Sequence, residues 1–134
     1  MKKMLVPSDF SDNSLVALTY AIELSKVTGA SLAVFHCLLP SSDLVFASLD
    51  ELSREQQAQK ELKLVSEQLR NQVSEAYRKL GMTVPHSTQV GVEINPLVVE
   101  KIMDVALTQH ADLIVMGTHG ASGFRGRLFG SNTS

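Results

Sequence analysis

The chain has 134 residues, of which 44% are hydrophobic and 19% are charged, and its formal net charge at pH 7 is −2. This length fits one domain with a buried core, and the charge excludes a molecule built as a whole to bind nucleic acid or an anionic membrane. A single cysteine, Cys37, excludes an intrachain disulfide framework and a cysteine-based zinc site.

The sequence has no apolar stretch long enough to span a bilayer. Its first residues also lack the apolar core of a signal peptide, because polar residues intervene too early. We therefore expect a soluble, cytoplasmic protein with no membrane partner and no nucleic-acid partner.

Strand and helix signals alternate from the start of the chain. The apolar residues 4–6, stopped by Pro7, predict a buried strand. Ser11 is a capping residue for a predicted helix that Gly29 ends in a left-handed conformation. The apolar positions of this helix are Leu15, Leu18, Ile22 and Leu24. Residues 32–39 form a second apolar run, which predicts a second strand.

The middle of the chain predicts a loop, a long helix and a third strand. Residues 41–51 are expected to form the loop, and residues 52–80 a polar helix closed by Gly81. One stripe of this helix is apolar and consists of Leu62, Val65, Leu69, Val73 and Ala76. Residues 83–90 predict the third strand, which is less apolar and is therefore expected near an edge of the sheet.

A third helix and a fourth strand follow. Asn95 and Pro96 predict a helix start, since a capping residue precedes a proline at the first helical position. The residues that this helix is expected to bury are Leu97, Val98, Ile102, Val105 and Leu107. Residues 112–116 predict a strand that is apolar on both faces and runs directly into Gly117.

The predicted order is therefore β-α-β-α-β-α-β followed by a glycine-rich loop. Alternating strands and helices with doubly apolar strands predict the α/β class, with an open parallel sheet covered by helices on both faces and right-handed crossovers. No internal repeat or linker divides the chain, so residues 1–134 are expected to form a single domain.

Ligands of open parallel sheets bind beyond the carboxyl ends of the strands. The candidate positions are therefore Pro7, Ser8 and Asp9 after the first strand, His36 and Cys37 near the end of the second, Gly91 after the third, and Gly117 after the fourth. Asp9 could act only as a turn or cap residue, but its place after the first strand favours a ligand role.

The segment from Gly117 to Thr133 contains the strongest functional signal. Its glycines let backbone N–H groups approach an anion and allow the positive φ of an anion-binding nest. Arg125 and Arg127 add positive charge, and Ser131, Asn132 and Thr133 add hydroxyl and amide donors at an expected helix start. We therefore favour a phosphate site over a flexible loop.

Two familiar phosphate motifs are absent from the sequence. There is no GxxxxGK[ST], which excludes a Walker-type nucleotide hydrolase. No GxGxxG follows the first predicted strand, which excludes the Rossmann dinucleotide fingerprint.

The pattern Gly117-x2-Gly120-x9-Gly130-Ser131 resembles the G-x2-G-x9-G-[ST] ATP motif of the universal stress protein family. Residues 5–11 also resemble the first strand and turn of that family, and residues 112–120 its fourth strand. The resemblance covers essentially the whole chain. It implies an adenine-nucleotide α-hydrolase-like, Rossmann-like fold that binds ATP and forms a homodimer.

The resemblance also implies a set of nucleotide-binding residues. Asp9, beside Ser8, would accept from the adenine or ribose, and the backbone at Pro7 and Cys37 would line the nucleoside. The residues it implies around the phosphates are Gly117, Gly120, Gly130, Ser131 and Asn132. From the same segment, Thr118, His119, Gly123 and Arg125 are further candidates, although Arg125 could equally be plain surface charge and His119 could face water. Mg²⁺ or Mn²⁺ would be carried by the phosphates, because the sequence shows no carboxylate cluster to hold a metal.

The chain departs from the family at its end. Members continue from the Gly-Ser turn through a helix into a fifth strand that is often used for dimer pairing, whereas this sequence ends at Ser134. A shortened domain is therefore expected, with the fifth strand missing and residues 113–116 exposed at a sheet edge.

These features predict an ATP-binding universal stress protein in which the nucleotide is mainly a regulatory ligand in stress response or signalling. No catalytic residue is assigned, because neither His36 nor His119 has a nucleophile partner and no general base is evident for a γ-phosphate. Slow ATP hydrolysis or autophosphorylation is the most that the resemblance implies. The alternative is a dimeric interaction module of the same fold that binds no nucleotide.

Overall fold

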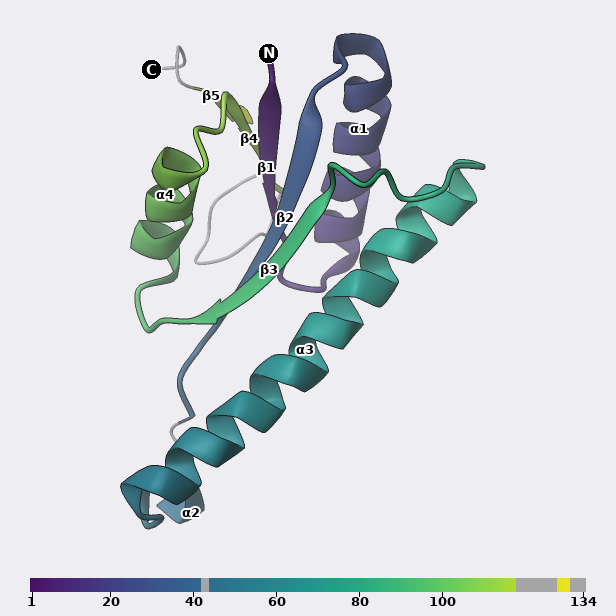
Figure 1. Ribbon diagram of the computed structural model, residues 1–134. Helices are drawn as coiled ribbons and strands as arrows, with labels where there is room; N and C mark the ends of the chain where they lie inside the picture. Colours follow the sequence, from purple (N-terminus) through teal and green to yellow (C-terminus); the bar gives the residue numbers. More distant parts are fainter. Residues whose placement is uncertain (42–43, 118–127, 131–134) are drawn as a thin grey trace.

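The computed structural model describes residues 1–41, 44–117 and 128–130 (Figure 1). In chain order its elements are β1 (Lys3–Pro7), α1 (Asp12–Thr28), β2 (Ser31–Leu38), α2 (Leu44–Ala47), α3 (Glu51–Lys79), β3 (Gln89–Ile94), α4 (Val98–Thr108), β4 (Leu113–Val115) and β5 (Leu128–Gly130). The strands form one sheet in the order β3-β2-β1-β4-β5, in which β1 to β4 are parallel. In this part of the chain, no helix is both long enough and apolar enough to cross a membrane.

Helices cover both faces of the sheet, as the sequence predicts. In Figure 1, α1 and α3 lie on one side and α4 lies on the other. Met4 and Val6 of β1 pack in the core that α1 and α3 close, whereas Leu5 packs in the core on the side of α4. All three side chains are fully buried, so the central strand is apolar on both faces because it has a helical layer on each side.

Both predicted ends of α1 are confirmed. The hydroxyl of Ser11 accepts a hydrogen bond from the backbone N–H of Ser14 at 3.1 Å, as an N-cap does. Gly29 adopts φ = 76° and donates its N–H to the carbonyl of Ser25 at 2.8 Å. The left-handed φ needed to close the helix is accessible to glycine at little cost.

The segment before α3 differs from the prediction. Residues 41–51, expected as a loop, contain the short helix α2, and α3 begins at Glu51 with Asp50 as its N-cap, accepting from Ser53 N–H at 2.7 Å. Only the part of α3 from Leu69 onward supplies fully buried side chains, which are Leu69, Val73, Ala76 and Tyr77. The first half projects past the sheet in Figure 1, so Leu62 and Val65 are only partly buried.

The predicted third strand, residues 83–90, is wrong in its boundaries. The strand is β3, Gln89–Ile94, and the residues before Gln89 form turns and loop. Pro85 removes a backbone donor in the predicted segment. Gly91 lies in the middle of β3, paired with Phe35 of β2, rather than after it. The predicted position at the sheet edge is confirmed.

Helix α4 buries fewer residues than expected. It begins at Val98, and Asn95 caps the turn before it by accepting from the N–H of Leu97 at 2.8 Å. Leu97 and Leu107 are 57% and 74% exposed, so the prediction that they are buried is wrong. Ile102, Val105 and Ala106 form the buried face.

The edge of β4 is not free, contrary to the four-strand sheet expected from the sequence. Leu128–Gly130 forms β5, which pairs antiparallel with β4 and places Gly130 opposite Leu113. A paired edge no longer offers its backbone groups to other chains. This edge is thus covered by a short strand from within the glycine-rich segment.

Gly117, directly beyond β4, lies against the first turn of α1. A Cβ built on Gly117 would be 2.6 Å from both the carbonyl carbon and the oxygen of Asn13 and 2.9 Å from the nitrogen of Ser14. All three atoms belong to the backbone, so they cannot move aside as a flexible side chain can. Glycine at this position permits close packing of the β4 end on α1.

At the opposite end of the sheet, Asp112 links the starts of two neighbouring strands, β1 and β4. Its carboxylate accepts hydrogen bonds from the backbone N–H groups of Lys2 at 2.8 Å and Lys3 at 3.1 Å. These two bonds lower the pKa of Asp112 below its ordinary value. The ionised carboxylate therefore ties the start of β1 to the start of β4.

We expect Gly117→Ala to destabilise the protein by about 1–3 kcal/mol, because the added methyl group overpacks a backbone contact. Urea denaturation measures the change in the free energy of unfolding. Gly91→Ala is the matched control, since its Cβ would meet only Phe35 Cδ1 at 3.9 Å, an ordinary contact. Equal stability of the two variants would show that the Gly117 contact is not tight.

A second prediction concerns acid stability. Because the folded-state pKa of Asp112 is lowered, its stabilisation is present above the unfolded-state pKa of about 3.9 and is lost as the pH falls through the folded-state pKa. Asp112→Ala should therefore lower the melting temperature at neutral pH and have little effect at about pH 2. Asp104→Ala, on the exposed side of α4, is the control; a pH-independent loss in Asp112→Ala would contradict this account.

Candidate functional site

The turn that leaves β1 is held by several hydrogen bonds at the carboxyl end of the sheet. Ser8 donates its backbone N–H to the carbonyl of Phe35 at 2.8 Å. The carbonyl of Ser8 lies 2.6 Å from Nδ1 of His36. A carbonyl oxygen only accepts, so Nδ1 carries the proton of this bond. Two bonds to β2 thus fix the backbone of Ser8, which is 6% exposed.

Asp9 follows on the rim. Its Oδ1 accepts from the backbone N–H of Ser11 at 3.0 Å, which is the turn geometry that aspartate favours. Burial raises the pKa of Asp9, but the hydrogen bonds from Ser11, from its own backbone and from Ser14 together outweigh it, so the pKa is lowered. Asp9 therefore remains an ionised acceptor at neutral pH, and its turn role is compatible with contact to a ligand.

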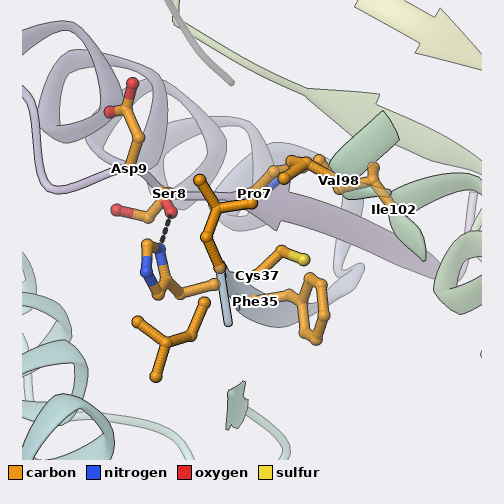
Figure 2. Close-up of a pocket in the computed structure, with 10 residues that line it drawn as sticks. Pro7, Ser8, Asp9, Phe35, Cys37, Val98 and Ile102 are labelled. Atoms are coloured by element: carbon orange, nitrogen blue, oxygen red, sulfur yellow. Dashed lines mark hydrogen bonds between the residues drawn. The ribbon is translucent and has the colours of Figure 1, made fainter. Parts of the chain in front are cut away.

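A pocket of about 370 Å³ opens beside this turn. Figure 2 shows Ser8 and Asp9 at one side of it and Val98 and Ile102 at the other, with Pro7 between them. Phe35, His36, Cys37, Leu38 and Leu39 complete the lining. A mostly apolar cavity with a few polar groups at one side is the usual form of a small-molecule site.

Cys37 is part of the apolar wall rather than a reactive group. Burial raises the pKa of its thiol, so the thiol stays protonated and is a poor nucleophile. Its Sγ donates to the carbonyl of Asn95 at 3.5 Å. This contact joins β2 to the loop before α4, the helix that supplies the opposite wall.

Phe10 carries backbone strain at the edge of the site. Its φ is 65°, a conformation that is uncommon for a bulky residue. The ring lies against His36, with centroids 4.7 Å apart and planes tilted by 56°. Strained conformations persist where the surrounding structure holds them, and they are frequent at functional sites.

The structure brings together only part of the predicted site. Pro7, Ser8, Asp9 and Cys37 line one pocket. Gly117 lies at the same end of the sheet, against α1. Predicted residues outside the described part of the chain are Thr118, His119, Gly120, Gly123, Arg125, Ser131 and Asn132.

Gly130 does not reach this pocket. It pairs with Leu113, four residues before Gly117, which is about 13 Å along an extended strand. Gly130 is thus at the amino end of β4, away from the carboxyl ends where Ser8 and Asp9 lie.

Sequence reasoning missed the apolar walls of the pocket. Val98 and Ile102 were expected only as core residues of a helix, and Phe35 was assigned no role beyond its strand. Their i, i+4 spacing places Val98 and Ile102 on one helix face, but spacing does not tell whether that face meets a core or a cavity. His36 is only partly buried, and its Nδ1 is satisfied by the carbonyl of Ser8.

The arrangement can bind and orient a ligand. Asp9, Ser8 and His36 supply polar contacts at one side, and the apolar walls can take a flat or aliphatic group. Among the residues described here, no group of three or more His, Cys, Asp or Glu side chains could hold a metal ion.

Known proteins that resemble this chain in sequence are universal stress proteins. The Universal stress protein family model matches residues 1–134. Universal stress protein MJ0531 of Methanocaldococcus jannaschii is 32% identical over 135 residues, which cover 97% of this chain and 72% of that protein.

Solved structures share the fold. Universal stress protein UspA from Lactobacillus plantarum superposes with a TM-score of 0.65 at 19% identity, covering 90% of this chain and 79% of its own. The universal stress protein from Archaeoglobus fulgidus in complex with dAMP gives a TM-score of 0.54 at 20% identity, with 91% and 85% covered. The match to the whole sequence, together with the strand order and the helical layers, shows that this chain belongs to the universal stress protein family.

Proposed function

We propose that this chain binds an adenine nucleotide in the pocket between the β1 turn and α4. The base lies between the apolar walls, and Asp9 accepts a hydrogen bond from the ribose or the adenine. In the proposal the nucleotide acts mainly as a regulatory ligand in stress response or signalling, in a cytoplasmic homodimer.

The pocket itself is the observation that carries the proposal. Its apolar lining and its size of about 370 Å³ suit a planar base, while an ionised carboxylate at the rim suits a hydroxyl or amine donor. It lies at the carboxyl end of β1 and beside the last residues of the neighbouring parallel strand β2, at the end of the sheet where open α/β sheets bind ligands. The Archaeoglobus fulgidus relative of the same fold, which binds dAMP, supports an adenine nucleotide as the occupant.

The phosphates are proposed to meet the segment that begins at Gly117. The spaced glycines, Thr118, His119, Arg125, Ser131 and Asn132 are the candidate contacts, with ATP as the ligand and Mg²⁺ or Mn²⁺ carried by its phosphates. Gly130 could join them only after leaving its place beside β4. The pocket therefore supports the nucleoside contacts more directly than the phosphate contacts.

Filling the pocket should weaken nucleotide binding. Val98→Trp places a large ring in the cavity, and we expect it to weaken ATP binding at least tenfold, about 1.4 kcal/mol, in calorimetric titration with Mg²⁺ present. Met103→Trp is the matched control, because Met103 is on the same helix but is 46% exposed. The chain has no other tryptophan, so fluorescence of each variant reports ligand contact at that position.

Equal binding by both tryptophan variants would place the nucleotide elsewhere. No binding by the native chain, under conditions where it is folded, would contradict the proposal and favour the dimeric interaction module that binds no nucleotide.

The phosphate half of the proposal has its own test. Gly120→Val adds a branched side chain that blocks backbone approach and resists a positive φ. We expect it to weaken ATP binding about tenfold or more while adenosine binding changes little, because the nucleoside pocket is untouched. Titrations with ATP and adenosine measure both affinities; an equal loss for both ligands would indicate that Gly120→Val disturbs the whole site.

A further inference from the structure

Ser8 receives one contact from a distant helix that the candidate site does not use. Its hydroxyl donates to Oε1 of Gln72 on α3 at 2.8 Å, across 64 positions of sequence. The same hydroxyl oxygen accepts from the backbone N–H of Phe10 at 3.2 Å. Gln72 is therefore bonded to the atom that also holds the strained part of the turn.

Gln72 provides the acceptor for the proton of the Ser8 hydroxyl. Ser8 Oγ is also 3.2 Å from Ser14 Oγ, but each hydroxyl has one proton to give. The Ser14 hydroxyl donates to the carbonyl of Ser11 at 2.7 Å. If Ser8 donates to Gln72, both protons have a good acceptor; without Gln72, the Ser8 hydroxyl has only the longer contact to Ser14. This satisfaction of both hydroxyls also orients the Gln72 amide, with Oε1 toward Ser8.

Packing fixes where Gln72 stands. Its neighbours on the inner face of α3, Leu69 and Val73, are 0% and 1% exposed and belong to the core between α3, α1 and the sheet. Because these neighbours are buried in the core, the helix turn that carries Gln72 has little freedom to move. The backbone of α3 at Gln72 is thus fixed relative to the sheet, and the side chain reaches Ser8 from a set position.

The turn of residues 8–11 needs interactions with other elements to keep its conformation. Phe10 is in the left-handed region at φ = 65°, a conformation that an isolated chain with a Cβ would leave. The pocket side of the turn is fixed by bonds from Ser8 to Phe35 and His36. Gln72 supplies the hold on the opposite side, from the helical layer that does not line the pocket.

We propose that Gln72 is a positioning residue of the pocket: through the Ser8 hydroxyl it keeps the turn of residues 8–11, and with it the Asp9 carboxylate, in the geometry that accepts a ligand. The ligand half of this inference rests on the proposed nucleotide site. The positioning half concerns only the turn and holds with or without a ligand.

Three variants test it. Gln72→Met keeps the length of the side chain and removes the acceptor, Gln72→Glu keeps an acceptor oxygen, and Gln68→Met makes the first change at an exposed site one turn earlier. In amide hydrogen exchange we expect Phe10 and Ser11 to exchange roughly fivefold faster in Gln72→Met, the scale of one net hydrogen bond, and near the native rate in the other two.

Ligand binding gives the second readout, with AMP as the probe, well below the melting temperature of each variant. We expect AMP affinity to fall about fivefold in Gln72→Met and to be rescued in Gln72→Glu to within about twofold. A merely structural role would instead lower the melting temperature of both Gln72 variants and leave affinity unchanged while the protein stays folded.

The outcomes separate the two proposals. Native exchange rates at Phe10 and Ser11 in Gln72→Met would overturn the positioning role, whatever the ligand result. Fast exchange together with no AMP binding by the native chain would support the positioning role and contradict the nucleotide site. Fast exchange with unchanged AMP affinity would overturn the claim that this geometry serves the ligand.

Discussion

The burial of β1 on every side is the constraint on which the rest of the structure depends. Met4, Leu5 and Val6 are fully buried, and the strand pairs with β2 on one edge and β4 on the other. Its faces and edges are therefore unavailable to a ligand, which leaves its two ends, and the pocket opens at the carboxyl end. The chain leaves β1 through Ser8, so the polar groups that the core excludes gather in the turn directly after it.

That turn lies between two separate cores and is bonded toward both sides. Phe35, Cys37 and Ile102 of the pocket belong to the core on the side of α4. Gln72 comes from α3, which packs on the other face. Ser8 uses its backbone toward β2 and its hydroxyl toward α3. Helix α4 on one face of the sheet thus lines the pocket, whereas α3 on the other face supports the turn at its rim.

The glycines of the last segment do not share one role. Gly117 fits a contact in which any Cβ would collide with the backbone of α1, so packing alone requires it. Gly130 pairs with Leu113 at the far end of β4. A spacing that predicts a phosphate loop therefore also contains a residue that packing requires, because the end of β4 lies against the first turn of α1.

The sequence by itself determined the class of the fold, the order of the four parallel strands and the three longer helices between them, both ends of α1 and the residues after β1. Each is a local matter of periodicity, capping or strand end, and local patterns predict such features. Tertiary structure decided the rest: β3 lies at Gln89–Ile94 because pairing with β2 fixes its register, and Leu97 and Leu107 are exposed because α4 turns another face to the sheet. Val98, Ile102 and Gln72 lie beside Ser8 and Asp9 only because segments far apart in the chain come together at the end of β1. The spacing of residues within one segment cannot predict such a contact.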